Sequence, residues 1–488
     1  MCKAQEKVLA DTFEIKGKWF LNNENLDDSI SGILRFSPKA IALELIGAFK
    51  GMNSRDLSID APSTTIFGIS DEGECFTLFN CYLVTAQLVA TGFSTVSYDV
   101  QKFYVGTQFV DSEDSLLITD VEVSFTNLNT WLRYPVIKRD RDNRAQRITN
   151  YVDLADPELS NRQILIPSLS LLLEECFDFN MTLPKECFLD ETQSMHVNRF
   201  YRLSSANKEL LSPAMFFDYA HHLCRLLSLF MGIATYFSYI EFNFPDLESV
   251  TLNGESIQIE NHCRLFFVQV GNITQALHLE VSRAHAIPTR YSDVHSNMAQ
   301  IFDCWFQEKH VFSEILDQFI SDLYIPTYVE NQFLSVVRGL ESYHRYFGTI
   351  DTAEDAALEE ARSNILAFIH EKTPPEFQEF FVSKVQYTGD ISLRSRLNTL
   401  IKELPPELSD HLFGTLTSNT RTKLIQQIID TRNYYTHRDN IKKYPNVIES
   451  GLAVSNLTDR LASMLTFFCL THLGIDRDIV AKRLIEWR

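Results

Sequence analysis

The sequence lacks any run of about 18 apolar residues, so we expect no membrane-spanning helix and no membrane partner. The nearest approach, residues 215–237, is interrupted by His221, His222 and Arg225. Residues 1–7 also lack the apolar core of a secretory signal peptide. These absences favour a cytoplasmic protein.

No Cys-x-x-Cys pair occurs among the nine cysteines, and the 13 histidines show no spacing typical of a zinc site. An odd, scattered set of cysteines in a large chain is typical of reduced thiols. The adjacent pair His221-His222 is explained more simply as a polar strip on a helix than as a pair of metal ligands. We therefore expect no metal and no cofactor.

Basic residues are scarce, with 44 Lys and Arg against 64 Asp and Glu, which gives a net charge of −20. This balance argues against a protein that coats nucleic acid broadly. Residues 384–443 differ, because they hold ten basic and six acidic side chains, a difference of +4. Such a local excess suits a focused RNA site, although a solvated helical face would explain it as well.

The pattern of apolar residues predicts an α+β protein of two or three domains, since 488 residues are long for a single core. Short segments rich in Val, Ile, Thr and aromatics fill residues 11–127, and they predict a sandwich-like or curled antiparallel sheet. Strand-like segments resume between 162 and 270 around a predicted helix at 213–237. Polar residues 137–161 indicate a linker or exposed loop. Together, residues 1–290 form a large β-rich region.

From about residue 295 onward the apolar spacing is helical. The predicted helices cover 298–319, 328–347, 353–370, 392–404, 418–435, 447–473 and 478–487, and Pro374-Pro375 and Pro405-Pro406 interrupt them. We expect a connecting helix within 291–325, followed by an all-α bundle over 326–488.

One stretch of this helical region carries the residues for chemistry. The apolar positions Leu424, Ile425, Ile428 and Ile429 have the spacing of a helix buried on one side, and a polar segment follows them. That segment contains Arg432, Asn433, Tyr434, Tyr435, Thr436 and His437. Arginine grips a phosphate with two parallel hydrogen bonds, and histidine moves a proton near neutral pH. Together they could cut a phosphodiester without a metal.

Two upstream blocks, residues 333–345 and 393–401, combine with Arg-Asn-Tyr-Tyr-Thr-His to resemble the HEPN domain of the ApeA type. This resemblance covers about the last third of the chain, and a weaker one covers the β-rich N-terminal region of the same proteins. It implies an endoribonuclease of anti-phage defence, acting by abortive infection on cellular RNA, with tRNA as one candidate. It also implies a homodimer or higher homo-oligomer, because HEPN ribonucleases pair two copies of the motif across a two-fold axis. The alternative is a non-catalytic HEPN-type module that binds a nucleotide or a protein.

The expected chemistry uses the 2′-hydroxyl of RNA as the nucleophile. His437 would move its proton or protonate the leaving oxygen, and Arg432 would neutralise charge on the phosphate. Asn433 would orient the reacting groups, as its match to the family pattern implies. Supporting candidates are Glu341, Thr436 and Tyr435, and candidate RNA-binding residues are Lys423, Arg438, Arg394 and Arg396.

The spacing of Arg432 and His437 raises a geometric question. On one continuous helix, positions five apart differ by about 140° in direction, so the two side chains would not converge. Either the helix ends near Asn433, or Arg432 meets the histidine of a second copy. The simpler explanations are an ion pair of Arg432 with Glu341 or Asp430, and a His437 that interacts with the negative end of the helix.

Two further expectations concern partners. The helix at 447–473 has more apolar positions than one face of a bundle needs, which suggests a contact between copies through Leu457, Leu461, Met464, Leu465, Phe468 and Leu473. The N-terminal region has no cluster of His, Arg or Lys comparable with residues 421–443. We therefore expect it to recognise a trigger, a phage-derived protein, and to supply no catalytic group.

Overall fold

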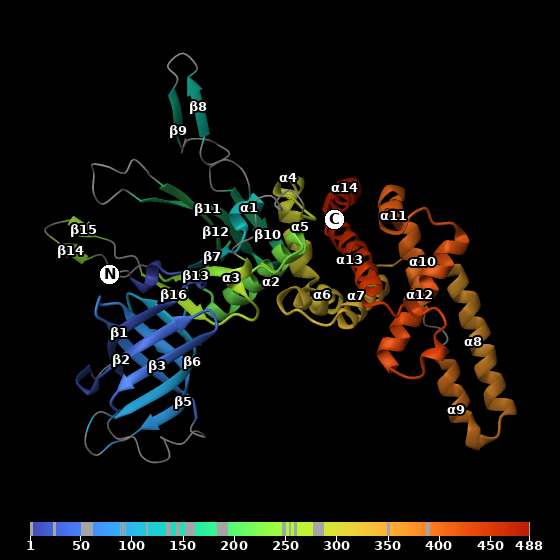
Figure 1. The fold of residues 1–488 in the computed structure, drawn as a ribbon, viewed down its shortest axis with the longest axis horizontal. Helices are drawn as coiled ribbons and strands as arrows, with labels where there is room; N and C mark the ends of the chain where they lie inside the picture. Colours follow the sequence, from blue (N-terminus) through green and yellow to red (C-terminus); the bar gives the residue numbers. More distant parts are fainter. Residues whose placement is uncertain are drawn as a thin grey trace. The chain divides into compact units, whose positions relative to one another are not determined.

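A computed structural model describes residues 3–487, apart from 23–25, 50–61, 88, 90, 91, 93, 114–115, 133–137, 143–146, 152–161, 183–193, 246–249, 253–254, 258–260, 277–286, 349–351 and 387–390. The chain divides into two compact units, Met1–Gln307 and Glu308–Arg488. Unit 1 is β-rich, and unit 2 is helical (Figure 1). The α+β organisation predicted from the sequence is confirmed.

The first six strands of unit 1 close into an antiparallel barrel, which is the curled antiparallel sheet of the two predicted alternatives and not the sandwich. They are β1 (Phe13–Phe20), β2 (Ile30–Ser37), β3 (Ala40–Ile46), β4 (Thr64–Ser70), β5 (Cys75–Gln87) and β6 (Thr95–Gly106). Their order is β6-β3-β2-β1-β4-β5, and β5 pairs with β6 to complete the ring. Buried aromatic side chains of Trp19, Phe36, Phe76 and Phe103 form its core. Gly68 is required on β4, because a Cβ atom there would lie 2.2 Å from the Trp19 ring.

Strand β6 also begins an open sheet. One of its edges pairs with β5, while the other pairs with β3 at residues 95–99 and with β16 (His262–Phe267) at residues 102–106. From β16 the sheet continues through β13 (Phe237–Asn243), β7 (Asp120–Phe125), β12 (Ser194–Ser205), β11 (Leu171–Thr182) and β10 (Arg162–Ile166). The barrel and the open sheet are therefore parts of one continuous sheet.

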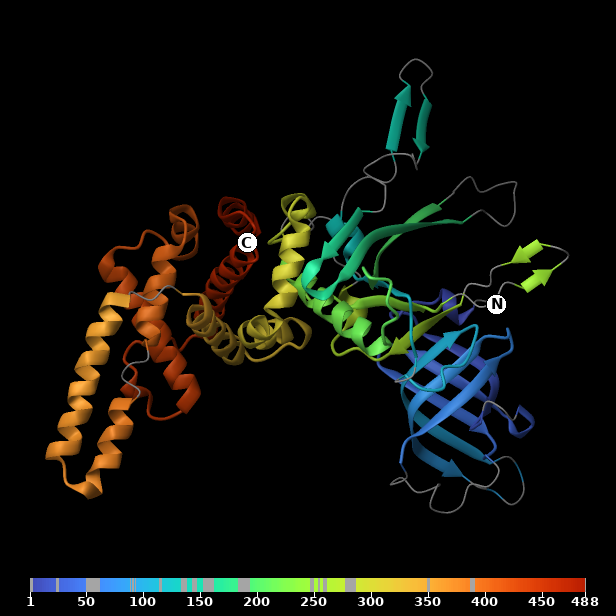
Figure 2. The same cartoon turned by 180° about the vertical axis from the view of Figure 1, so that it is seen from behind.

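Helix α2 (Pro213–Met231) packs against β7 of the open sheet. The Ser212 side chain caps its start by accepting a hydrogen bond from the Met215 amide, and Gly232, with φ +67°, ends it. The predicted helix at 213–237 is therefore too long, since residue 237 already begins β13. Two small hairpins, β8 (Lys138–Asp142) with β9 (Arg147–Tyr151) and β14 (Val250–Leu252) with β15 (Glu255–Ile257), complete the strands (Figure 2).

Short helices fill the remainder of unit 1: α1 (Leu128–Leu132), α3 (Ile273–Ala276), α4 (Tyr291–Val294) and α5 (Met298–Gln307). The helix predicted at 298–319 is divided, because α5 ends at Gln307 and α6 begins at Lys309, where the two units also divide. Cys75, Cys81, Cys176, Cys263 and Cys469 form no disulfide bond.

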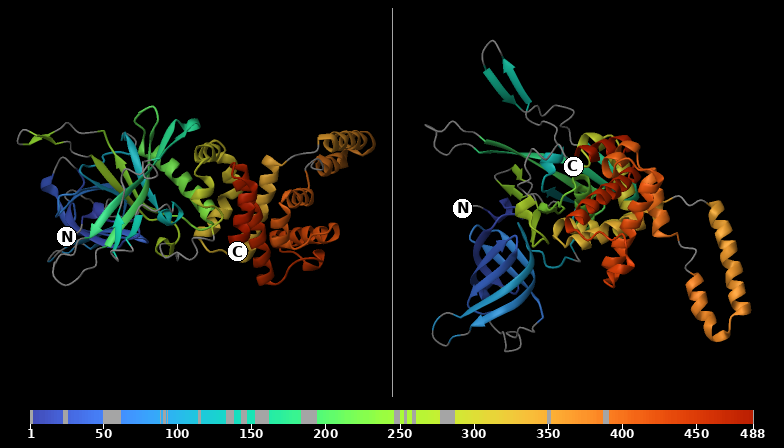
Figure 3. Two further views of the ribbon diagram at one scale, coloured as in Figure 1. Left: turned by 90° about the horizontal axis from the view of Figure 1, so that it is seen from above. Right: turned by 45° about the vertical axis from the view of Figure 1, so that its right-hand side comes forward.

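Unit 2 contains nine helices within its described residues. They are α6 (Lys309–Tyr324), α7 (Val329–Phe347), α8 (Thr352–Lys372), α9 (Pro375–Gln386), α10 (Leu393–Glu403), α11 (Pro406–Phe413), α12 (Ser418–His437), α13 (Gly451–His472) and α14 (Arg477–Trp487) (Figure 3). Helix α7 is central, since it packs on α6, α10, α12 and α13. From the sequence, Pro375 and Pro406 were predicted only to interrupt helices. In the structure they are also the first residues of α9 and α11, because proline is well tolerated in the first turn of a helix.

Two features of unit 2 concern its surface. The α8–α9 hairpin exposes Ile365, Phe368, Phe377, Phe380 and Phe381. By contrast, helix α13 is buried over most of its length and packs mainly against α7. No helix in the described part of the chain is long and apolar enough to cross a membrane.

Candidate functional site

The candidate site is built on helix α12. The Thr417 side chain caps its start by accepting a hydrogen bond from the Thr420 amide, and Ile425 and Ile428 are buried in the unit. The helix continues without a break to His437. Arg438 ends it in the left-handed conformation, with φ +50°, and the Arg438 amide donates to the Tyr434 carbonyl at 2.7 Å. The helix therefore does not end near Asn433, which removes the first of the two arrangements considered for the motif.

Two buried residues just before the motif fix the chain that follows α12. The Asp430 carboxylate, 5% exposed, accepts hydrogen bonds from the Asn446 backbone amide at 3.1 Å and from the Asn446 side chain at 2.9 Å. It also accepts from the Gln426 side chain at 2.6 Å. The neighbouring Thr431 hydroxyl accepts from the Ile448 amide at 3.1 Å. Asp430 is therefore a structural anchor and does not pair with Arg432.

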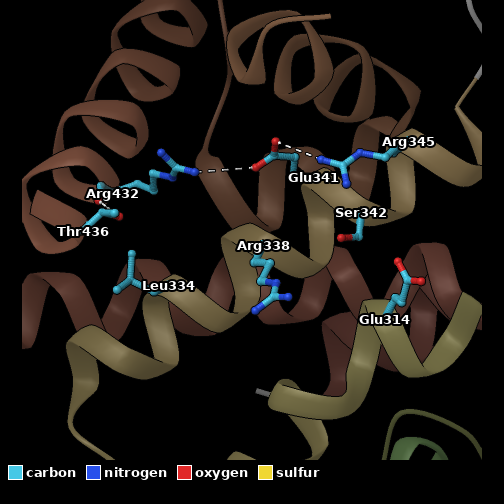
Figure 4. Close-up of a pocket in the computed structure, with 8 residues that line it drawn as sticks. All are labelled: Glu314, Leu334, Arg338, Glu341, Ser342, Arg345, Arg432 and Thr436. Carbon is cyan, nitrogen blue, oxygen red and sulfur yellow. Dashed lines mark hydrogen bonds and ion pairs between the residues drawn. The ribbon is translucent and has the colours of Figure 1, made fainter. Parts of the chain in front are cut away.

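Arg432 points from α12 toward α7. Its Nη2 atom lies 3.9 Å from Glu341 Oε2, and its Nη1 atom donates to Asn433 Oδ1 at 3.1 Å. Glu341 also lies 3.5 Å from Arg345 Nη2, so this carboxylate is shared by two arginines (Figure 4). Both separations exceed those of well-formed charged hydrogen bonds, so the guanidinium groups are only loosely held.

These side chains line a cavity of about 360 Å³ within unit 2. Its lining is charged and comes from three helices: Glu314 of α6, Leu334, Arg338, Glu341, Ser342 and Arg345 of α7, and Arg432 and Thr436 of α12 (Figure 4). The α7 residues repeat at helical spacing and share one face of that helix. The Thr436 hydroxyl donates to the Arg432 backbone carbonyl at 2.7 Å.

His437 lies apart from this cavity. It is the last residue of α12, its side chain is exposed, and it is not one of the described side chains that line the cavity. Five residues of continuous helix separate it from Arg432, which corresponds to about 140° of rotation. Within one copy of the chain, the arginine and histidine of the motif therefore lie on different faces of α12.

The two tyrosines of the motif pack between these faces. The Tyr435 hydroxyl donates to the Ile448 carbonyl at 3.4 Å, and its ring contacts Phe333. Partial burial raises the pKa of Tyr435, with a further contribution from Glu330. The Arg438 guanidinium lies 4.9 Å from the centre of the Tyr435 ring. Tyr435 is thus a neutral packing residue near neutral pH.

The four candidate RNA-binding residues are placed differently from one another. Lys423 and Arg438 are exposed on or beside α12, and Arg394 is exposed on α10 with its side chain on Gln426. Arg396 is 8% exposed, donates to the Ile391 carbonyl at 3.0 Å and approaches His344 Nδ1 at 3.4 Å. Burial leaves Arg396 no access to a bound strand, so the prediction that it contacts RNA does not fit the structure.

Three charged side chains of the cavity were not among the residues predicted from the sequence. Arg338 and Arg345 stand three before and four after Glu341, so helical spacing alone would have placed them beside it. Glu314 comes from another helix, and nothing in the local sequence signals its position. It accepts a hydrogen bond from the Tyr346 hydroxyl at 2.5 Å.

The proposed contact between copies through α13 also needs correction. The six apolar positions on which it was based are at most 5% exposed: Leu457, Leu461, Met464, Leu465, Phe468 and Leu473. These positions are already buried within the chain, and α13 packs against both α7 and α14. The apolar excess of this helix reflects its central position and gives no surplus surface for a partner.

Comparison with known proteins agrees with this division of the chain. Residues 14–305 match the model of ApeA N-terminal domain 1, and residues 334–479 match that of the Apea-like HEPN domain. No curated protein and no solved structure was found to match the chain. The first match covers more than half of the sequence and almost all of unit 1, while the second contains α12 and most of the cavity. The chain therefore belongs to the ApeA family, with an ApeA N-terminal domain followed by an ApeA-type HEPN domain.

Proposed function

We propose that this protein is a metal-independent endoribonuclease of anti-phage defence, with Arg432, Asn433 and His437 as its catalytic residues. Membership of the ApeA family supports the defence role. The observation that carries the catalytic part is the polar end of α12, where Arg432 faces an arginine-lined cavity and is held only loosely by Glu341. A loosely held guanidinium still has donors available for a phosphate.

The proposed reaction follows from the residue types. His437 would take the proton of the 2′-hydroxyl, whose oxygen attacks the adjacent phosphorus. The bond from phosphorus to the 5′-oxygen breaks, and the leaving oxygen takes a proton from water. Arg432 would stabilise the negative charge that builds on the phosphate oxygens. The products would be a 2′,3′-cyclic phosphate and a 5′-hydroxyl. DNA would not be cut, because it lacks the nucleophile.

We further propose that each catalytic site combines Arg432 of one copy with His437 of another. The support is the separation of these residues onto different faces of one helix, together with the exposure of His437. A two-fold contact near the end of α12 would bring both motifs together, since such a contact joins the same surface of each copy. If no second copy bound, Arg432 and His437 would stay apart, and the protein would be a non-catalytic binding module.

Mixing two inactive variants tests this arrangement. Arg432→Ala and His437→Ala chains would each be inactive alone, but a mixed dimer would hold one intact pair. Random mixing in equal amounts gives mixed dimers in half the cases, each with one of two sites intact, so about a quarter of wild-type activity should return. The control is a mixture of Arg432→Ala with the double variant, which restores nothing. If the wild-type protein cleaves RNA but the first mixture recovers no activity, the catalytic site lies within one chain.

RNA cleavage itself is tested with purified protein and total RNA in the presence of EDTA. Cleavage that survives the chelator and leaves cyclic phosphate ends is expected. Sequencing of RNA ends from cells that express the protein would then identify the substrate, for which tRNA is one candidate. RNA that stays intact under all conditions, while a nucleotide or protein binds to unit 2, would favour the non-catalytic module.

Unit 1 is proposed to recognise the trigger, a phage-derived protein. Its support is the extensive β-sheet, since β-sheets are used to bind an extended peptide or a protein surface. Exchange of residues 1–307 for those of a relative should transfer the range of phages resisted. An unchanged range, in a chimera that still needs Arg432 and His437, would place trigger recognition in unit 2.

A further inference from the structure

The cavity beside Arg432 contains a second arginine that is available for a ligand. Arg338 lines the cavity and is exposed, and it forms no hydrogen bond or ion pair with the described residues. The other charged residues of the lining do have partners. Arg345 and Arg432 both approach Glu341, and Glu314 accepts a hydrogen bond from Tyr346. Arg338 is therefore a cation at a preformed cavity with no counter-ion among the described residues.

The charges of the lining favour an anion. Three arginines and two glutamates leave a net charge of +1, and Glu341 already serves two of the arginines. Arginine presents its donors in a planar fork that matches a phosphate group. A cation without a partner next to the proposed catalytic arginine is well placed to hold the part of the RNA backbone that is not cut.

We propose that Arg338 binds an RNA phosphate next to the scissile one, so that the α7 face of the cavity is a substrate-binding subsite. This inference rests on the proposed ribonuclease function. Arg338 would position the strand, while Arg432 acts on the phosphate that reacts. Its side chain touches the bound strand away from the reacting atoms, so its loss should weaken binding more than it slows the chemical step.

Binding can be measured apart from cleavage with a short, fluorescent, single-stranded oligonucleotide whose sugars are all 2′-O-methylated. This probe cannot be cut by the proposed chemistry. With the full-length protein, Arg338→Gln should weaken binding about tenfold, as expected for one charge-assisted contact. The slope of log affinity against log salt should fall by about 0.7, which corresponds to one phosphate contact on a single strand. Arg338→Lys should recover part of both effects.

The matched control is Lys482→Gln, which removes a positive charge from an exposed position of α14 outside the cavity and should leave binding unchanged. Cleavage of ordinary RNA by the same variants should show a raised KM and a nearly constant kcat for Arg338→Gln. Equal binding by wild type and Arg338→Gln would overturn the subsite, even if the wild type cleaves RNA. Arg338-dependent binding without cleavage by the wild type would support the subsite and overturn the proposed catalysis.

Discussion

Arg432 Nη2 lies 3.9 Å from Glu341 Oε2, and this ion pair joins α12 to α7 across the cavity. Glu341 also approaches Arg345, so one carboxylate aligns two cations. The side chains of Glu341 and Arg432 are 25% and 36% exposed, and an ion pair of this exposure contributes at most about 1 kcal/mol to stability. We therefore expect this ion pair to act mainly by positioning the Arg432 side chain.

Glu341→Gln should lower kcat for RNA cleavage without raising KM. The substitution removes the charge that aligns Arg432, but it also removes a negative charge from the cavity, which favours binding of the RNA backbone. Steady-state kinetics with a defined RNA would separate the two parameters. A raised KM with constant kcat would show that Glu341 contributes to binding and not to alignment.

Arg432→Ala and His437→Ala should each abolish RNA cleavage and toxicity while the fold remains intact. His437 is exposed and Arg432 is half-buried, with no strong internal partner, so neither loss should cost much stability. RNA gels and growth of expressing cells give the activity, and circular dichroism gives the fold. Wild-type cleavage by either variant would refute the proposed chemistry.

Asp430→Ala should destabilise unit 2 by about 2–3 kcal/mol, because the Asn446 backbone amide and side chain would lose their charged, buried acceptor. Hydrogen exchange should become faster at the Asn446 amide, which Asp430 holds directly. Asp439→Ala is the matched control, since Asp439 is exposed and bonds Lys443 on the surface. Equal exchange rates in both variants would contradict the anchoring role of Asp430.

Gly339→Ala should also destabilise unit 2, by about 1–3 kcal/mol. The new Cβ atom would lie 2.7 Å from Leu465 Cδ2 of α13 and 2.9 Å from the Ile315 carbonyl oxygen of α6. The Ile315 contact is with backbone and cannot move aside, so α7 itself must shift. Gly451→Ala is the control, because a Cβ there meets nothing within 4 Å. Thermal unfolding of the two variants compares their stabilities. If Gly339→Ala were as stable as the wild type, α7 would be loosely packed.

His344 gives unit 2 a dependence on pH. Burial, with a contribution from Arg396, lowers the pKa of His344 below its ordinary value of 6.5. The neutral ring is therefore favoured in the folded state, and below about pH 6.5 the unfolded chain binds a proton that the folded chain does not. Stability should fall as the pH drops from about 7 through this window, and His344→Gln should flatten the dependence. The measurement is thermal unfolding of wild type and His344→Gln at several pH values. If the stability of both proteins changed equally with pH, His344 would have no such role.

The sequence was sufficient to predict the type of most elements because their patterns are local. Strands alternate, helices repeat at 3.6 residues, and the Arg432–His437 segment stands directly after an apolar run. It could not predict that α13 would be covered on several sides, since a buried helix and a helix with a free apolar face have the same composition. The sequence could not predict closure of the barrel either, because closure depends on the pairings of β1 with β4 and of β3 with β6, which join strands that are not consecutive. Arg338 was overlooked for a different reason: its spacing from Glu341 was visible, but its lack of a partner was not.

The shared strand β6 has a consequence for synthesis of the protein. Residues 102–106 need β16 as their second partner, and β16 is made long after β6. During translation, this part of β6 is an uncovered strand edge, which can template pairing with other chains. The nascent chain is therefore most exposed to aggregation until residue 267 has left the ribosome. Because β16 precedes all of unit 2, the sheet of unit 1 can be complete before the candidate ribonuclease domain emerges.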